Sequence, residues 1–448
     1  MSKSNPRKLS EAPIGKLLLE YSIPSIVGMT LTSLYNIIDS IFIGHGVGAM
    51  ALSGLAITFP LMNLLVAFCA LVGVGGATIA SIRLGAGDHK GAEMITGNVA
   101  ILCFFSALFY GGLTFFFLDD ILTFFGASES TLPYAREFMQ IILLGSPIFY
   151  FLMGLNNVMR ATGYPRKAMW SSMLTVGCNV VLAPIFIFAF KWGIRGAAFA
   201  TVLSQFVGMV WVFSHFLNKK NFVHFTRESF KLRWRIMKNI FSVGISPFLM
   251  NVCACVVVIF INTQLATYGD DLSIGAFGIV NRVQMLFIMI VLGLAQGMQP
   301  IAGYNWGAGK IDRVKHTVKL CLGAATVVTS LGAIIGWFFP DFVVHSFSDD
   351  AELAVRTVPA LQIAVSMFPI VGLQVVICQF YQSIGKAGIA IFLSLSRQLV
   401  FFVPLLAILP LFWGVTGVWL SIPASDFFAV ALAVIMFRIY VRKLDSAK

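Results

Sequence analysis

The sequence has 448 residues, of which 58% are hydrophobic and 11% are charged. About 25% of the residues of a typical soluble protein are charged, so this composition cannot supply a water-facing surface for the whole chain. The composition excludes a soluble globular protein and predicts that most of the chain contacts lipid. The formal net charge of +12 does not indicate nucleic-acid binding, because the basic residues lie in short connections between apolar runs.

Apolar runs of about 20 residues or more recur along the whole chain, and each is long enough to cross a hydrocarbon core about 30 Å thick. We predict twelve transmembrane helices, at residues 17–43, 53–80, 94–118, 132–157, 166–190, 194–216, 237–265, 273–301, 315–339, 353–381, 387–411 and 414–440. The first run is too long for the apolar region of a cleavable signal, so we expect a retained helix. The predicted fold class is an all-α polytopic membrane protein.

The basic residues predict the orientation of these helices. If the N-terminus is cytoplasmic, 25 of the 31 Lys and Arg residues fall on the cytoplasmic side, as the positive-inside rule requires. An even number of helices returns the C-terminus to the same side. We therefore expect a multi-pass protein of the cell inner (plasma) membrane, with the N- and C-termini in the cytoplasm.

A polar, basic connection from Asn218 to Lys238 divides the chain near its middle. Its composition is typical of an amphipathic segment at the cytoplasmic surface. We expect a cytoplasmic N-terminal tail at residues 1–16, an N-lobe at 17–216, a cytoplasmic basic linker at 217–236, a C-lobe at 237–440 and a cytoplasmic C-terminal tail at 441–448.

The two lobes carry the same motifs in one register. GIRGAAFATVLSQ from Gly193 matches GVTGVWLSIPASD from Gly414 at an offset of 221 residues, and Gly163 matches Gly385 at an offset of 222. Each lobe has an even number of helices, so the lobes enter the membrane in the same orientation. The repeat predicts two parallel, pseudo-symmetric six-helix bundles, which is an architecture of transporters.

The candidate residues for coupling to a cation lie in the N-lobe. Asp39 falls inside an apolar run, where a carboxylate costs roughly 2.5–3.5 kcal/mol. Asn36 lies three residues earlier on the same helix face, and Asn179 and Thr201 supply further oxygens. We predict an oxygen-rich pocket for a proton or a monovalent cation, with an outward-pointing acid and plain interhelical hydrogen bonds as the structural alternatives.

Asp426 is a secondary candidate, because it lies near the middle of the last predicted helix. An acid at that depth needs a partner or a proton. Arg282 and Arg397 are basic residues that lie away from the ends of the predicted helices, and either can supply the partner. A functional acid and a structural ion pair are both open at this point.

Pro24 and Pro247 each interrupt the first helix of a lobe, because proline lacks the amide hydrogen that continues the helix. We predict hinges there, with static kinks as the alternative.

No catalytic residue, metal site or cofactor is predicted. The seven cysteines and six histidines show no metal-ligand spacing, and no HExxH, Walker A or nucleophile-elbow pattern is present. This argues against a metalloprotease, an ATPase or a hydrolase.

Several motifs, in order along nearly the whole chain, resemble those of the multidrug and toxic compound extrusion (MATE) transporters, and more closely their MepA-like bacterial branch. They are NIIDSIFIG, RLGAGDHKGAE, MRATGYPRKA, CNVVLAPIFIF, GIRGAAFAT and AQGMQPIAGYNWGAGK. The resemblance implies a V-shaped pair of lobes that exchange outward-moving cationic drugs for inward-moving protons or sodium ions.

The resemblance also implies a cation site in the N-lobe. Its residues map onto Asp39, Asn179, position 183 and Thr201. The family's LDP sequence reads Leu182, Ala183 and Pro184 here, so one carboxylate of that site is absent. This departure leaves proton coupling through Asp39, or through a relocated acid such as Asp426, as an alternative to sodium coupling.

The sequence therefore predicts a secondary active multidrug efflux antiporter that exports small amphipathic organic cations in exchange for H+ or Na+. We expect it to work in the lipid bilayer as a monomer, without nucleic acid and without a bound cofactor. A related flippase for lipid-linked oligosaccharides or lipids is the alternative, and a membrane-embedded enzyme is a third and weaker one.

Overall fold

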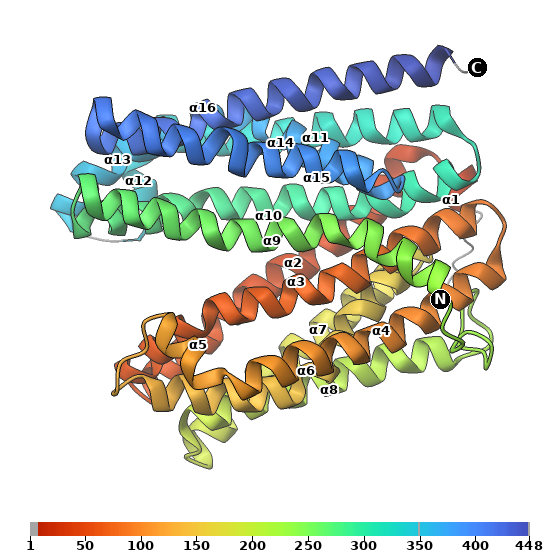
Figure 1. The fold of residues 1–448 in the computed structure, drawn as a ribbon, viewed down its shortest axis with the longest axis horizontal. Coiled ribbons are helices and arrows are strands. Elements are labelled where there is room, and N and C mark those ends of the chain that lie inside the picture. Colours follow the sequence, from red (N-terminus) through yellow and green to blue (C-terminus); the bar gives the residue numbers. More distant parts are fainter. Residues whose placement is uncertain (1–7, 348–349, 447–448) are drawn as a thin grey trace. The chain divides into compact units, whose positions relative to one another are not determined.

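The computed structural model describes residues 8–347 and 350–446, and within them it contains helices and no strand. The elements in chain order are α1 (Lys8–Glu11), α2 (Ile14–Gly46), α3 (Ala49–Gly85), α4 (His89–Phe116), α5 (Leu118–Phe124), α6 (Leu132–Ala161), α7 (Pro165–Pro184), the π-helical segment η1 (Ile185–Ala189), α8 (Gly193–Leu217), α9 (Trp234–Tyr268), α10 (Asp271–Gly307), α11 (Ile311–Phe338), α12 (Pro340–His345), α13 (Ala351–Val365), α14 (Phe368–Ser383), α15 (Ala387–Leu395), the π-helical segment η2 (Ser396–Phe402) and α16 (Val403–Ser446). Figure 1 shows them in sequence colours.

The described residues contain ten helices that are long and apolar enough to cross a membrane, and an eleventh span if the bent pair α13 and α14 counts as one. The last of the ten, Ala387–Leu444, has 58 residues. As one straight helix it would be about 87 Å long, whereas the hydrocarbon core is about 30 Å thick. The backbone leaves helical geometry at Gly414. Divided there, this stretch is long enough for two spans, and the predicted number of twelve spans depends on that division.

The predicted spans are close to the observed helices, and most differences are a few residues at the ends. The helices α1, α5 and α12 were not predicted, because they have 4, 7 and 6 residues and cannot produce an apolar run of membrane-spanning length. The all-α polytopic fold class is confirmed.

The predicted repeat is confirmed in the local backbone. Gly193 and Gly414 have φ angles of 57° and 54°, a region that side chains with a Cβ rarely occupy. The matched glycines Gly163 and Gly385 also have positive φ. The short helices α5 and α12 begin at Leu118 and Pro340, an offset of 222 residues, so each half repeats a short helix after its third span.

The chain divides into two compact units. Unit 1 comprises Met1–Ala12, Val27–Asn251 and Gly303–Gly309, and unit 2 comprises Pro13–Ile26, Val252–Ala302 and Lys310–Lys448. Three helices, α2, α9 and α10, are therefore shared between the units along their length. The domain boundaries expected from sequence, at the basic linker, place each of these helices in one lobe.

Unit 1 is held by helices α3, α4, α6, α7 and α8, which pack on one another (Figure 1). The connection after α8 is fastened to α4 by Asn98, whose Nδ2 donates to the carbonyl oxygens of Ser229 (3.2 Å) and Lys231 (3.1 Å). The Asn98 Oδ1 accepts from the amide of Arg233 (3.2 Å). This part of the predicted linker is a docked segment of unit 1.

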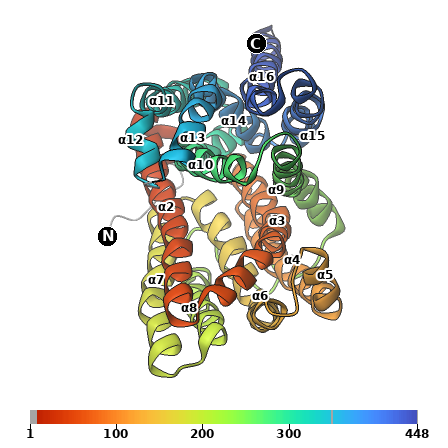
Figure 2. The same cartoon turned by 90° about the vertical axis from the view of Figure 1, so that its left-hand side faces the viewer.

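Unit 2 packs α11, α13, α14, α15, η2 and α16 together. Its apolar core also takes residues from the ends of α9 and α10 that belong to this unit, among them Leu265 and Val280, which are fully buried. The labels of Figure 2 show α11, α13, α14 and α16 in this unit.

Candidate functional site

Asp39 is a buried acid in the part of α2 that belongs to unit 1. Its exposed fraction is 6%. Ile37, Ile38 and Ile41 flank it in α2, and the helix continues to Gly46, so the short side chain of the acid cannot reach the end of the helix. The expectation that Asp39 is enclosed within the bundle, and does not point into the surroundings, fits this burial.

The structure gathers Asn179 of α7 and Thr201 of α8 into one polar cluster with α2. The two residues are 1% and 3% exposed, and Asn179 Nδ2 donates to Thr201 Oγ1 at 3.4 Å. Tyr35 joins the cluster, because its hydroxyl lies 2.8 Å from Thr201 Oγ1. Figure 2 shows α2, α7 and α8 as neighbours in unit 1 (Figure 2).

Tyr35 was not among the residues predicted from sequence. It precedes Asp39 by four residues, so the two share a face of α2, and it lies close enough to interact with Asp39 electrostatically. The spacing is visible in the sequence. Tyrosine in an apolar run is common, however, so the spacing alone did not single it out.

The hydrogen bonds of Thr201 leave it with little capacity to hold a further ligand. Its hydroxyl donates to the carbonyl oxygen of Ala197 (3.1 Å), and a hydroxyl has one proton to donate and two lone pairs. Tyr35 and Asn179 then fill both lone pairs as donors. Thr201 therefore orients its two neighbours, and its oxygen becomes available to a cation only if one of these bonds opens.

Two oxygens of the cluster remain without a hydrogen bond. Asp39 Oδ1 and Asn179 Oδ1 are buried and accept none from the side chains and backbone that the structure describes. No described basic residue forms an ion pair with Asp39. The side chain of Asn36, which was predicted to share this site, lies outside the described residues.

Position 183, which corresponds to the missing carboxylate of the family's site, is buried and carries no acid. Ala183 is fully buried near the end of α7, and the following Pro184 cannot donate a backbone hydrogen bond. The chain continues as the π-helical segment η1. A second acid is therefore absent from this part of the cluster, and the oxygens at hand suit a proton or a monovalent cation. Among the described residues, no group of three or more His, Cys, Asp and Glu side chains is arranged to hold a metal ion.

Unit 2 contains a different arrangement around Asp426. This acid is 4% exposed. Its Oδ1 accepts a hydrogen bond from Nε of Arg397 in η2 (2.9 Å) and lies 2.8 Å from Nη2 of the same arginine in an ion pair. Of the two basic partners that the sequence left open, Arg397 is the one in contact. Arg282 is an exposed residue of α10, and the structure gives it no ion pair with a described residue.

The predicted hinge prolines lie beside the places where helices pass between the compact units. Pro24 precedes the boundary at Ile26, and Pro247 precedes the boundary at Asn251. The third shared helix, α10, has Pro300 just before its boundary at Ala302. Pro300 was missed, because nothing in the sequence marks that boundary. Whether these helices bend during function stays a prediction.

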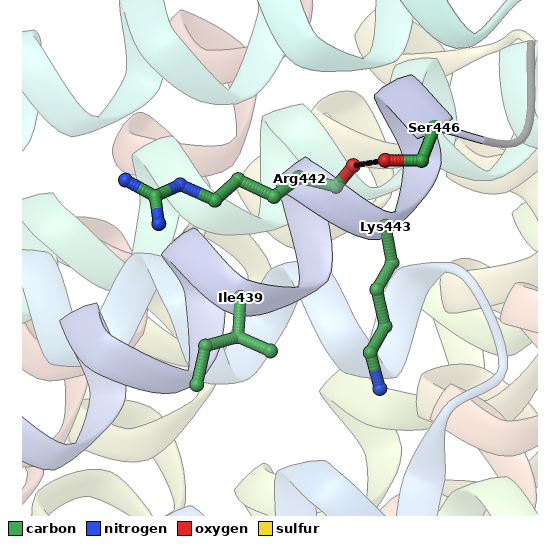
Figure 3. A pocket seen from close by; sticks show the side chains of 4 residues that line it. All are labelled: Ile439, Arg442, Lys443 and Ser446. Atoms are coloured by element: carbon green, nitrogen blue, oxygen red, sulfur yellow. Dashed lines mark hydrogen bonds between the residues drawn. The ribbon is translucent and has the colours of Figure 1, made fainter.

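An open hollow at the end of α16 is lined by Ile439, Arg442, Lys443 and Ser446. These positions repeat at helical spacing on one face of α16. The Ser446 hydroxyl donates to the Arg442 carbonyl oxygen at 3.1 Å, and the two basic side chains point in different directions (Figure 3). The hollow consists of exposed basic residues at a helix end, as expected of a segment at the cytoplasmic face. It shares no residue with either polar cluster.

The sequence model of the MatE family matches residues 24–185 and 246–408, which is most of the chain and covers corresponding parts of both halves. The chain belongs to the MatE family. This confirms the resemblance to MATE transporters that its motifs predict. The matched residues include Asp39 and Asn179.

The chain is similar along nearly its whole length to proteins described as the multidrug export protein MepA. It is 28% identical over 430 residues to the one from Staphylococcus haemolyticus (strain JCSC1435), covering 96% of this chain and 94% of the relative. The one from Staphylococcus aureus (strain MSSA476) is 26% identical, with 95% and 94% covered.

Solved structures confirm the fold. A MATE crystal structure in a bent conformation matches with a TM-score of 0.94 and 24% identity, covering 100% of this chain and 99% of the other. An outward-facing multidrug resistance MATE family transporter matches with a TM-score of 0.93 and 24% identity, covering 99% of both chains.

Proposed function

We propose that this chain is a secondary active multidrug exporter, which moves small amphipathic organic cations out of the cell in exchange for H+ or Na+. The observation that carries the coupling half of this proposal is the buried carboxylate of Asp39, whose Oδ1 accepts no hydrogen bond from the described chain. The Oδ1 of Asn179, in the same unit, is also buried without one. The MepA relatives, described as multidrug export proteins, support the substrate class.

Stability does not explain the Asp39 cluster. An acid deep in a membrane helix costs roughly 2.5–3.5 kcal/mol, whereas an interhelical hydrogen bond between polar side chains contributes about 0.6 kcal/mol on average. The bonds of Thr201 to Tyr35 and Asn179 therefore offset less than the cost of the acid. A group retained at a net cost in an apolar setting favours a functional role.

The coupling ion would act by supplying the missing partner. A proton on Asp39, or a sodium ion shared by Asp39 Oδ1 and Asn179 Oδ1, removes the unfavourable lone carboxylate. Sodium would also draw on Thr201 by displacing one of its donors, since that hydroxyl is saturated. Either ion changes the hydrogen bonds that join α2 to α7 and α8.

Such a change can alter the side of the membrane from which the transported compound is accessible only if part of α2 moves. The segment of α2 that carries Asp39 belongs to unit 1, and the segment before Val27 belongs to unit 2. Pro24 weakens the helix just before that boundary. We propose that ion binding at Asp39 shifts the bend of α2 and that α9 and α10 follow near Pro247 and Pro300.

The alternatives receive less support. The relatives are described as multidrug export proteins, which does not favour the flippase for lipid-linked oligosaccharides. A membrane-embedded enzyme would need reactive side chains gathered at one depth. The two clusters instead hold one acid each, and MatE family members are transporters. We propose that the chain works as a monomer in the plasma membrane, with its basic segments and both termini in the cytoplasm.

Purified protein in proteoliposomes tests the proposal. Ethidium movement is measured under an imposed proton gradient, an imposed sodium gradient or neither, with protein-free vesicles as the control. The proposal expects ethidium flux with one of the two gradients and none without. Translocation of lipid-linked sugars with no gradient-dependent ethidium flux would contradict it in favour of the flippase.

A further inference from the structure

The ion pair of Arg397 and Asp426 in unit 2 is unevenly exposed. The side chain of Asp426 is 5% exposed, whereas that of Arg397 is 32% exposed. The acid is therefore enclosed, whereas part of the arginine side chain is accessible. A pair that served only to join two helices would have no need for one partner to be reachable.

Arg397 holds Asp426 with part of its hydrogen-bonding capacity. Its Nε donates to Asp426 Oδ1 at 2.9 Å, and its Nη2 lies 2.8 Å from the same oxygen as an ion-pair contact. A guanidinium has five N–H donors and can engage both oxygens of a carboxylate in a fork. The observed geometry uses one oxygen, so it is not the most stable form of such a pair. A smaller loss of free energy is then needed to release the arginine.

Arg397 lies in a π-helical segment, which is consistent with its release from Asp426 during function. Residues Ser396–Phe402 form the π-helical segment η2, and π-helical turns are rare and frequent at functional sites. The next residue, Gln398, has a buried Oε1 that accepts no hydrogen bond from the described chain. A second unsatisfied acceptor in the same segment as the arginine favours a positively charged or donating ligand over an anion.

We propose that Asp426 is a second binding site for a monovalent cation. Without the ligand, Arg397 pairs with the Asp426 carboxylate, and the ligand displaces Arg397 when it binds. The class of ligand is a lipophilic organic cation, which competes with the guanidinium for the carboxylate of Asp426. This inference rests on the proposed export of organic cations and adds to it a site in unit 2. The site has no counterpart in the Asp39 cluster, where no described base covers the acid.

The proposal predicts opposite effects for the two halves of the pair. Removing the guanidinium in Arg397→Gln removes the competitor, so the Kd for tetraphenylphosphonium should fall about tenfold. Removing the carboxylate in Asp426→Asn removes the site, so that Kd should rise about tenfold. The double variant should match Asp426→Asn, because without the acid the arginine has nothing to cover.

The experiment measures tetraphenylphosphonium binding to the purified full chain by equilibrium dialysis. Arg282→Gln is the matched control, because Arg282 is an exposed arginine of α10 with no ion pair to a described residue. Its Kd should equal that of the native chain. The opposed shifts should persist in an Asp39→Asn background, since the Asp39 cluster belongs to unit 1.

A conservative variant guards against misfolding of Arg397→Gln. Arg397→Lys keeps the positive charge but replaces the fork with a single ammonium group, so it should lower the Kd in the same direction by a smaller factor. Shifts of Arg397→Lys and Asp426→Asn in the same direction, or no shift in either, would overturn the inference while leaving cation export intact. Absence of tetraphenylphosphonium binding by the native chain would instead overturn the proposed export, and this inference with it.

Discussion

The two compact units each contain a buried aspartate, and these two residues differ in whether they have a basic partner. In unit 1, Asp39 lies among neutral oxygen and amide groups and has no basic partner among the described residues. In unit 2, Asp426 is paired with Arg397 by an ion pair that includes a hydrogen bond from Nε. A buried pair can be structural, whereas a lone buried acid is costly. This difference is the reason why we propose ion coupling in unit 1 and a site occupied by an arginine in unit 2.

The largest expected difference between the two acids is in the effect of their substitution on the unfolding free energy. Loss of one partner from a buried ion pair costs about 3–5 kcal/mol when it leaves a buried charge unpaired. Arg397→Gln should therefore lower the unfolding free energy by about that amount, and Asp426→Asn by less, because the Arg397 side chain is 32% exposed. The paired apolar replacement Arg397→Met with Asp426→Leu should recover most of it. Asp39→Asn should not destabilise the chain, because it removes a costly charge and breaks no ion pair.

Thermal unfolding of the purified variants in one detergent provides these values. Equal destabilisation by Asp39→Asn and Asp426→Asn would show that Asp39 has a structural partner, and the distinction between the units would then be wrong.

The proposed hinge prolines lie in the helices that are shared between the two units, so their substitution should affect transport. Alanine in place of Pro24, Pro247 or Pro300 restores a backbone donor near a unit boundary, and it should lower the rate of ethidium transport several-fold, as hinge substitutions do. Initial rates in proteoliposomes measure the effect. Pro147→Ala is the control, since α6 lies wholly within unit 1, and a loss as large as that at the boundary prolines would refute the hinge assignment.

Tyr35→Phe tests a smaller contribution within unit 1. It removes the donor to Thr201 and leaves Asp39 in place. An interhelical hydrogen bond of this kind is worth about 0.6 kcal/mol, so the apparent affinity for the coupling ion should change about threefold. Thr32→Val is the control, because the Thr32 hydroxyl bonds within its own helix to Gly28. Ion-dependent ethidium transport, measured over a range of proton or sodium concentrations, gives both affinities, and equal shifts would count against the cluster.

The smallest effect is expected at an exposed acid of unit 2, between α9 and α10. Hydrogen bonds from Ser273, together with the charge of Arg356, lower the pKa of Asp270 below its ordinary value of 3.8. Its contribution to stability is therefore present above pH 3.8 and is lost as the pH falls through its lowered pKa. Thermal unfolding should show a small loss in Asp270→Asn at about pH 7 that decreases as the pH falls below 3.8; a loss independent of pH would contradict this.

The sequence predicted what depends on hydropathy and on helical spacing. Twelve spans, the repeat and the solitary Asp39 all follow from runs of apolar residues and from the cost of a charge among them. Asn179 and Thr201 were found because they are polar residues in apolar helices. Tyr35 was within reach of the same reasoning, since it precedes Asp39 by one turn.

Other features depend on tertiary packing and were not predictable. Arg397 and Asp426 are far apart in the sequence and on different helical elements, so periodicity could not choose between Arg397 and Arg282. The π-helical backbone at η1 and η2 and the division of α2, α9 and α10 between units leave no pattern in composition. Pro300 therefore resembled any other proline of a membrane helix.

The most direct test of coupling by the lone acid of unit 1 is gradient-driven ethidium efflux from cells that carry Asp39→Asn, with the exposed Asp120→Asn as the matched control. The unpaired Asp39 carboxylate predicts that efflux falls at least about tenfold, equivalent to about 1.4 kcal/mol, while the Asp120→Asn cells retain native efflux. Unimpaired, gradient-dependent efflux by Asp39→Asn would contradict the role of Asp39 in coupling.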